Sequence, residues 1–109
     1  MAWLLRDGDV LCAAEVAATW RTRGRGLLGR DGVTGALVFT RGRQVHTVGM
    51  RFPVDVAFCD RNGQVLHTAT LRPWRMSRPV LGSHMVIEAE AGAFERWRLR
   101  RGDVVELKT

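Results

Sequence analysis

Short apolar runs separated by glycine-containing turns recur along the chain, which is the pattern of a compact β-rich domain. The segments that we expect to form strands are 36–39, 44–48, 54–59, 64–71, 86–91 and 104–107. Residues 10–17 form either a strand or a strand that enters a helix, because their alanines fit both. Asn62-Gly63 lies between two of them and favours a tight hairpin turn. The pattern therefore predicts a mostly β fold with an α+β tendency, a small β-barrel or β-sandwich of about seven short strands.

Two segments have helical spacing. From residue 19, apolar and small residues recur at intervals of three and four through about residue 29, so we expect one helix near the N-terminus. Residues 93–99 are expected to form one or two helical turns. Residues 72–79 contain Pro73 and Pro79 and are expected to form an exposed loop, which at this length often carries function.

The length of 109 residues, with 46% apolar and 26% charged residues, fits one globular domain over residues 1–109. No apolar run approaches the ~20 residues needed to span a bilayer, and the opening five residues are too few for a signal-peptide core. The cytoplasm is therefore the expected compartment.

The formal net charge of +6 raises the question of nucleic-acid binding. However, all 17 basic residues except Lys108 are arginines, and this excess is typical of the codon bias of a GC-rich genome. The arginines are also dispersed, with no block of five or more. Nucleic acid is therefore the second choice of partner, after a small anionic ligand or an acidic peptide.

Metal and cofactor chemistry finds little support. Cys12 and Cys59 lack the spacing of a zinc or redox pair, so we expect two reduced, buried thiols. The three histidines are 21 and 17 residues apart, which does not indicate a metal site. The Gly-x-Gly-x-x-Gly spacing at 24–29 has no preceding buried strand, so we expect no dinucleotide cofactor.

Four segments together resemble a known family: 25–30, 46–55, 86–92 and Gly102-Asp103. They include the spacings Met-x-x-Pro-x-Asp, ending at Asp55, and Glu-x-x-x-Gly, beginning at Glu88. In this order they look like the bacterial and archaeal Domain of Unknown Function family 192, over about residues 10–107. The resemblance implies a mostly β fold and no established activity. Family members often show Trp-Met-Lys-Asn-Thr where this chain has Val-Gly-Met-Arg-Phe at 48–52.

The candidate ligand site combines a titratable group, guanidinium groups and an aromatic platform. A loop that presents an indole between guanidinium groups can bind a carboxylate or phosphate bidentately. We expect the site at a mouth between the loop 72–79 and the segment around His46. Its candidate residues are His46, Met50, Arg51, Asp55, Arg72, Trp74, Arg75 and Arg78. The alternative for Trp74 is a plug packed over the barrel mouth.

Three carboxylates are expected to be structural: Asp55, Glu88 and Asp103. For Asp55, we expect a buried side chain held by Arg51 or by backbone N–H groups of the bend at 51–53. The alternative is that Asp55 orients His46 as a general base in a hydrolase. No serine or cysteine has the sequence context of a nucleophile, so a non-catalytic binding or accessory module is favoured.

Overall fold

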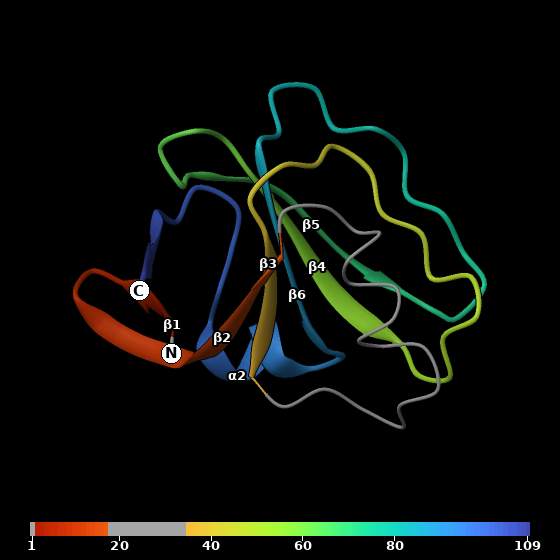
Figure 1. Cartoon of the computed structure of the whole chain (residues 1–109), viewed down its shortest axis with the longest axis horizontal. Helices are drawn as coiled ribbons and strands as arrows, with labels where there is room; N and C mark the ends of the chain where they lie inside the picture. Colours follow the sequence, from red (N-terminus) through yellow and green to blue (C-terminus); the bar gives the residue numbers. More distant parts are fainter. Residues whose placement is uncertain (1, 18–34) are drawn as a thin grey trace.

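The computed structural model describes residues 2–17 and 35–109. Within these residues, seven strands form one sheet in the order β5-β4-β6-β3-β2-β1-β7, and one short helix lies beside it (Figure 1). The elements are β1 (Ala2–Arg6), β2 (Asp9–Ala17), β3 (Ala36–Phe39), β4 (Val54–Cys59), β5 (Val65–Leu71), β6 (Met85–Glu90), α2 (Ala93–Trp97) and β7 (Val105–Lys108). In the described part of the chain, no helix is long and apolar enough to cross a membrane.

The sheet curls until its two outer strands meet at one end. Gln64, just before β5, forms an antiparallel bridge with Val104, just before β7. Beside this bridge, the Val65 amide donates to the Asp103 carbonyl at 2.8 Å. The sheet is therefore a half-barrel closed by a short seam. The mostly β prediction is confirmed, and the barrel describes the architecture better than the sandwich.

The two faces of the sheet bury separate apolar clusters. All six residues of β4 are buried, as expected for a strand with apolar residues on both faces. Ala57 and Cys59 belong to a cluster that also contains Phe94 of α2. Val54, Val56 and Phe58 belong to a second cluster covered by residues of the connection between β3 and β4. This covering connection leads to the candidate site.

The prediction of a strand at 44–48 is wrong. This connection makes only an isolated bridge, between His46 and Met76, and does not join the sheet. Its alternating pattern has another cause: Val45 and Thr47 are buried against the connection between β5 and β6, while Gln44 and Val48 are exposed. The helix predicted at 19–29 lies outside the described residues, whereas the helical turns predicted at 93–99 are present as α2.

One strand was not anticipated. β1 pairs with both β2 and β7, and Leu4 at its centre is fully buried. The β1–β2 connection is Asp7-Gly8, with positive φ angles of 53° and 82°. Asp-Gly with this backbone conformation is a hairpin signal, and it was available in the sequence.

Both cysteines are free thiols, and Cys59 is fully buried. Burial raises the pKa of the Cys12 thiol to about 11. Burial and the neighbouring charge of Asp60 raise the pKa of the Cys59 thiol to about 12. Because the thiolate is the reactive form, few molecules carry it at pH 8.

We therefore expect both thiols of the folded protein to react with Ellman's reagent at pH 8 more slowly than a free thiol, whose pKa is about 8.5. From the thiolate fraction, the rate should fall roughly two hundredfold for Cys12 and roughly two thousandfold for Cys59. In 6 M guanidinium chloride, both should react at the ordinary rate. Rapid labelling of Cys59 under native conditions would contradict its burial.

Candidate functional site

Two long connections run side by side at one end of the half-barrel (Figure 1). One comprises residues 40–53, between β3 and β4, and the other residues 72–84, between β5 and β6. Backbone hydrogen bonds join Ser77 to Val45 at 2.8 Å and Val80 to Arg43 at 2.8 Å. We call these two segments the loop pair. Their mutual hydrogen bonds fix the positions of the side chains that they present.

Thr47 is the central anchor of the loop pair. It is fully buried, and its backbone N–H donates to the Arg75 carbonyl at 2.7 Å. Its hydroxyl Oγ1 donates to the Arg72 carbonyl and accepts from the Arg75 N–H at 2.9 Å. The Trp74 N–H donates to the Thr47 carbonyl at 2.9 Å. The turn 72–75 is thus held in place by one threonine from the other loop.

Trp74 is held outward by this anchored turn. Its side chain is 64% exposed, and its backbone has a positive φ of 62°, which is rare for a bulky residue. Such strain persists only where surrounding contacts impose it, and it clusters at functional sites. The possibility that Trp74 plugs the barrel is therefore excluded. Arg72, Arg75, Met76 and Arg78 on the same loop are also exposed.

The other predicted site residues of the 46–51 segment divide between core and surface. Met50 is buried and packs in the second apolar cluster, so it contributes to the fold and not to a binding surface. His46 is half-buried and lines a cavity of about 170 Å³ together with Met76. Arg51 is exposed. Of the residues predicted for the site, His46 therefore lies beside the Arg72–Arg78 loop, whereas Met50 lies in the core.

Asp55 is 5% exposed, and its carboxylate binds backbone N–H groups at the start of α2. Its Oδ2 accepts hydrogen bonds from the Gly92 N–H at 2.9 Å and the Phe94 N–H at 3.1 Å. Its Oδ1 accepts one from the Thr70 hydroxyl at 2.7 Å. The donors are therefore not Arg51 or the bend at 51–53, as expected from the sequence. Asp55 instead fixes the start of the helix and ties it to β5.

The geometry does not bring Asp55 together with His46. Asp55 lines a cavity of about 420 Å³ beside Thr68, Thr70 and Glu95. His46 lines the smaller cavity at the loop pair, and the hydrogen bonds of Asp55 go to other groups. The carboxylate consequently does not orient the imidazole.

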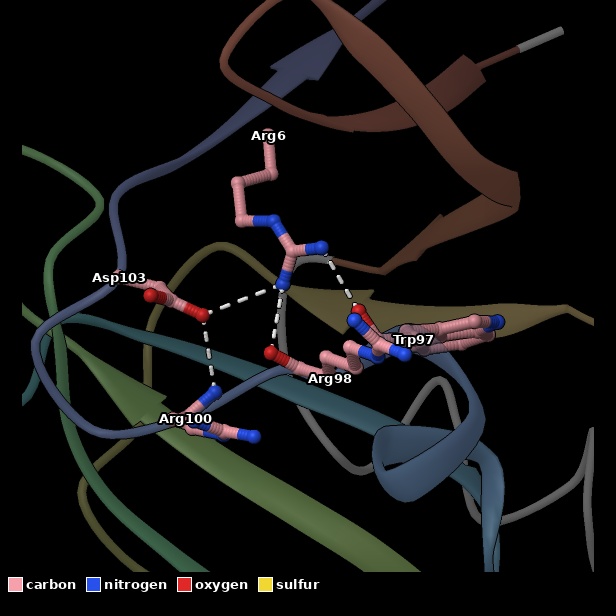
Figure 2. A network of polar contacts seen from close by, with 5 residues as sticks. All are labelled: Arg6, Trp97, Arg98, Arg100 and Asp103. Carbon is pink, nitrogen blue, oxygen red and sulfur yellow. Dashed lines mark hydrogen bonds and ion pairs between the residues drawn. The ribbon is translucent and has the colours of Figure 1, made fainter.

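Asp103 forms part of a network at the seam (Figure 2). Its Oδ2 accepts from Arg6 Nη1 at 3.2 Å and from the Arg100 N–H at 2.9 Å. Arg6 also donates to the carbonyl oxygens of Trp97 and Arg98, at 2.7 and 2.8 Å. The network therefore joins β1, the end of α2 and the turn before β7. Glu88, in the centre of β6, is fully buried.

A groove lies between β5 and the loop pair. It has a volume of about 590 Å³, and its apolar lining includes Phe58 at its base and Met76 and Leu81 on the loop side. Its charged or titratable lining residues are His67, Arg78 and Arg101, and none of the described residues that line it is acidic. We call it the basic groove. Figure 1 shows the loop pair extending away from the sheet at this end.

Several residues of the basic groove were not predicted as site residues. His67 projects from β5 and stacks on Phe58, with ring centroids 6.2 Å apart. Arg101 comes from the turn before β7, and Leu81, which is 93% exposed, from the end of the long loop. These positions are far apart in the sequence, so no local motif joins them. The one available signal was the alternation of β5, which places His67, Ala69 and Leu71 on one face.

Within the described ranges, no group of three or more histidine, cysteine, aspartate or glutamate side chains is placed to hold a metal ion. The glycines at 24–29 lie outside the described residues. The side chains that the described part of the groove presents are guanidinium, imidazole and apolar groups.

Comparison with known proteins places the chain among uncharacterised relatives. UPF0127 proteins from Pyrococcus abyssi and Pyrococcus furiosus are 36% and 32% identical to it over 62 residues, which is 57% of this chain. The match spans about half the length of these relatives, 53% of each. A crystal structure of a protein of unknown function from Novosphingobium aromaticivorans shares the fold, with a TM-score of 0.79 and 21% identity over 96% of this chain and 82% of that chain.

The family model that matches covers nearly all of the sequence. It is DUF192, described as "Uncharacterized ACR, COG1430", and it matches residues 3–107. The chain therefore belongs to the DUF192 family of uncharacterised proteins.

Proposed function

We propose that this protein is a non-catalytic binding module that recognises a small organic anion or an acidic peptide in the basic groove. The observation that carries the proposal is the groove itself: two arginines and one histidine line an apolar hollow that has no acidic lining residue among the described residues. The volume of about 590 Å³ lies within the ordinary range for small-ligand sites.

The chemistry of the lining favours a carboxylate attached to an apolar group. Guanidinium groups bind carboxylates with two parallel N–H···O bonds, and these bonds are about twice as strong as neutral ones. The apolar residues Leu71, Met76 and Leu81 offer a surface for the rest of the ligand. An uncharged apolar ligand would make no ion pair with the arginine side chains. An inorganic anion would make no contact with the apolar residues.

Trp74, Arg72 and Arg75 are proposed as the outer rim of this site. Trp74 precedes the groove residue Met76 by two positions, and the Thr47 anchor holds its side chain in solvent. An exposed aromatic side chain beside arginines is the composition found at binding hot spots. This rim would contact the part of a longer ligand that extends beyond the groove.

The hydrolase alternative required His46 and Asp55 to lie together as a pair. Its support is weaker, because the two residues line different cavities. Nucleic-acid binding retains only the net charge of +6 as support. If charge alone drives it, affinity for duplex DNA should disappear at physiological salt, since counterion release is then its only driving force.

The proposal is tested by titrating the ¹⁵N-labelled protein with 4-phenylbutyrate in 150 mM NaCl and following amide shifts by NMR. We expect shifts at groove residues and at least tenfold weaker binding for Arg78→Ala, because a hydrogen bond to a charged group is worth about 1.5–3 kcal/mol and about 1.4 kcal/mol corresponds to a factor of ten. Arg61→Ala is the matched control, since Arg61 is exposed and lines a different cavity.

Trp74→Ala extends the test to the rim. With an acidic peptide longer than the groove, it should weaken binding while leaving the melting temperature unchanged, because an exposed side chain contributes little to the core. Equal binding by the parent protein and Arg78→Ala would overturn the proposal. Sequence-selective, sub-micromolar binding of duplex DNA in the same salt would favour the nucleic-acid function instead.

A further inference from the structure

The seam of the half-barrel opens after one residue of β5. At its closed end, the Val65 N–H donates to the Asp103 carbonyl and the Val65 carbonyl accepts from the Gly102 N–H, both at 2.8 Å. The Val105 N–H also donates to the Gly63 carbonyl at 2.9 Å. Beyond Val65, β5 is an end strand of the sheet, and among the described residues no other strand pairs with its outer side.

The open part of β5 lacks the usual protection of an edge strand. Natural edge strands avoid pairing with foreign strands by carrying charged residues, lysine above all, or proline. β5 has the sequence VLHTATL, with no Asp, Glu, Lys, Arg or Pro in seven residues. The strand on the other side of the seam, β7, reads VELK and carries two charges in four residues. Of the two end strands of the sheet, β5 is therefore the one without this protection.

Each face of β5 lines a cavity, and the charged side chains among the described lining residues differ in sign between the two cavities. On one face, His67, Ala69 and Leu71 line the basic groove, and Leu66, at the irregularity between Val65 and His67, borders it as well. On the other, Thr68 and Thr70 line the cavity of about 420 Å³, which Ala69 also borders. The charged residues in its described lining are Asp55 and Glu95, and none of the described lining residues is basic. The carboxylate of Asp55 is engaged in three hydrogen bonds, so Glu95, which is exposed, is the available acidic group.

We propose that the partner is an extended peptide that adds to the outer edge of β5 as a further strand. This rests on the proposed function and specifies its ligand class. Main-chain hydrogen bonds along β5 would supply affinity, and pockets for alternate side chains would supply specificity, as in other cases of strand addition. The peptide continues the pairing that Gly102 and Val105 begin at the seam.

The two cavities define the side-chain pattern of the peptide. Successive side chains of a strand point to opposite faces. Every second residue therefore enters the basic groove and is acidic or apolar, to match Arg78, Arg101 and the apolar lining. The intervening residues face Thr68, Thr70 and Glu95 and are hydroxylic or basic.

The probe is the acetylated and amidated heptapeptide Thr-Glu-Thr-Leu-Lys-Glu-Thr. Its second, fourth and sixth residues present Glu, Leu and Glu to one face. Two further versions are N-methylated on the odd or on the even backbone amides. A strand pairs through alternate amides only. We expect the parent peptide to bind, one methylated version to lose at least tenfold in affinity, and the other to bind within about threefold of the parent.

Hydrogen exchange of the protein gives an independent readout. Binding should slow the outward-facing amides of residues 66–71, and leave the amides of the β1–β2 turn unchanged. The composition-matched peptide Thr-Lys-Thr-Leu-Glu-Glu-Thr places its Lys on the side of the basic groove and one Glu on the side of Glu95. It should bind at least tenfold more weakly than the parent peptide, because these two charges then face cavities of like charge.

Each alternative outcome separates strand addition from the proposed function. If both methylated peptides bind as tightly as the parent, strand addition is wrong while recognition of side chains in the groove stands. If 4-phenylbutyrate binds through Arg78 but no peptide does, the same conclusion holds. If neither probe binds, both proposals fail. If sedimentation shows a dimer that protects the β5 amides without peptide, the edge pairs with a second copy and the peptide proposal is overturned.

Discussion

Replacing Gly63 by alanine is expected to lower the free energy of unfolding by about 3 kcal/mol. Gly63 has a φ of 85°, and a Cβ atom at this position would lie 2.1 Å from the carbonyl oxygen of Val105. The left-handed backbone costs a residue with a Cβ about 1–2 kcal/mol. The clash adds to this cost, because it separates the two backbones that form the seam and weakens hydrogen bonds worth about 1 kcal/mol each.

Urea denaturation of Gly63→Ala measures this loss, with Gly8→Ala as the matched control. Gly8 has a similar φ of 82°, but an added Cβ there meets no atom within 4 Å. The control should lose only the conformational part, about 1 kcal/mol. If the two variants are equally stable, the close approach at the seam does not contribute to stability.

Asp55→Ala is expected to destabilise the protein by about 3 kcal/mol. The substitution removes the acceptor of three hydrogen bonds and leaves the Gly92 and Phe94 N–H groups without it. Hydrogen bonds to charged groups are worth about 1.5–3 kcal/mol each. The substitution also removes the desolvation cost of a buried carboxylate, which offsets part of the lost hydrogen-bond energy. The far-ultraviolet signal of α2 is small, so thermal or urea unfolding is the measurement.

Two variants separate the contributions of the Asp55 oxygens. Thr70→Val removes only the donor to Oδ1 and should cost about 1 kcal/mol. Asp55→Asn retains one oxygen acceptor but places an amide donor at the other position, so its effect should lie between the two. An unchanged melting temperature for Asp55→Ala would contradict the structural role and reopen a functional one.

The strands at the centre of the sheet could be predicted because the residue pattern within each strand indicates which of its side chains are buried. The continuous apolar run 54–59 and the Asn62-Gly63 turn specify β4, β5 and the hairpin between them. The segment 44–48 has the same kind of alternation, but its partners are backbone groups of another irregular segment, such as those of Arg75 and Ser77. Periodicity records which side chains are buried and does not record what buries them.

The candidate site could be predicted only in part. The two prolines correctly indicated an exposed loop that carries Trp74 and its arginines. The basic groove combines side chains from β4, β5, that loop and the turn before β7, and only the topology brings them together. Asp55 was expected to be buried, but two of its three donors, Gly92 and Phe94, lie at the start of α2, nearly 40 residues later in the sequence.

The pairing of β1 with β7 determines when the sheet is completed during synthesis. Leu4 and Leu107 are register partners, so β1 gains its second neighbour only after about 100 more residues have been made. Until then, β1 and the first apolar cluster, which includes Leu4, have an open side. Contacts between distant segments slow folding, because the intervening chain must be closed into a large loop first. The nascent chain therefore exposes an apolar surface on the ribosome until β7 emerges.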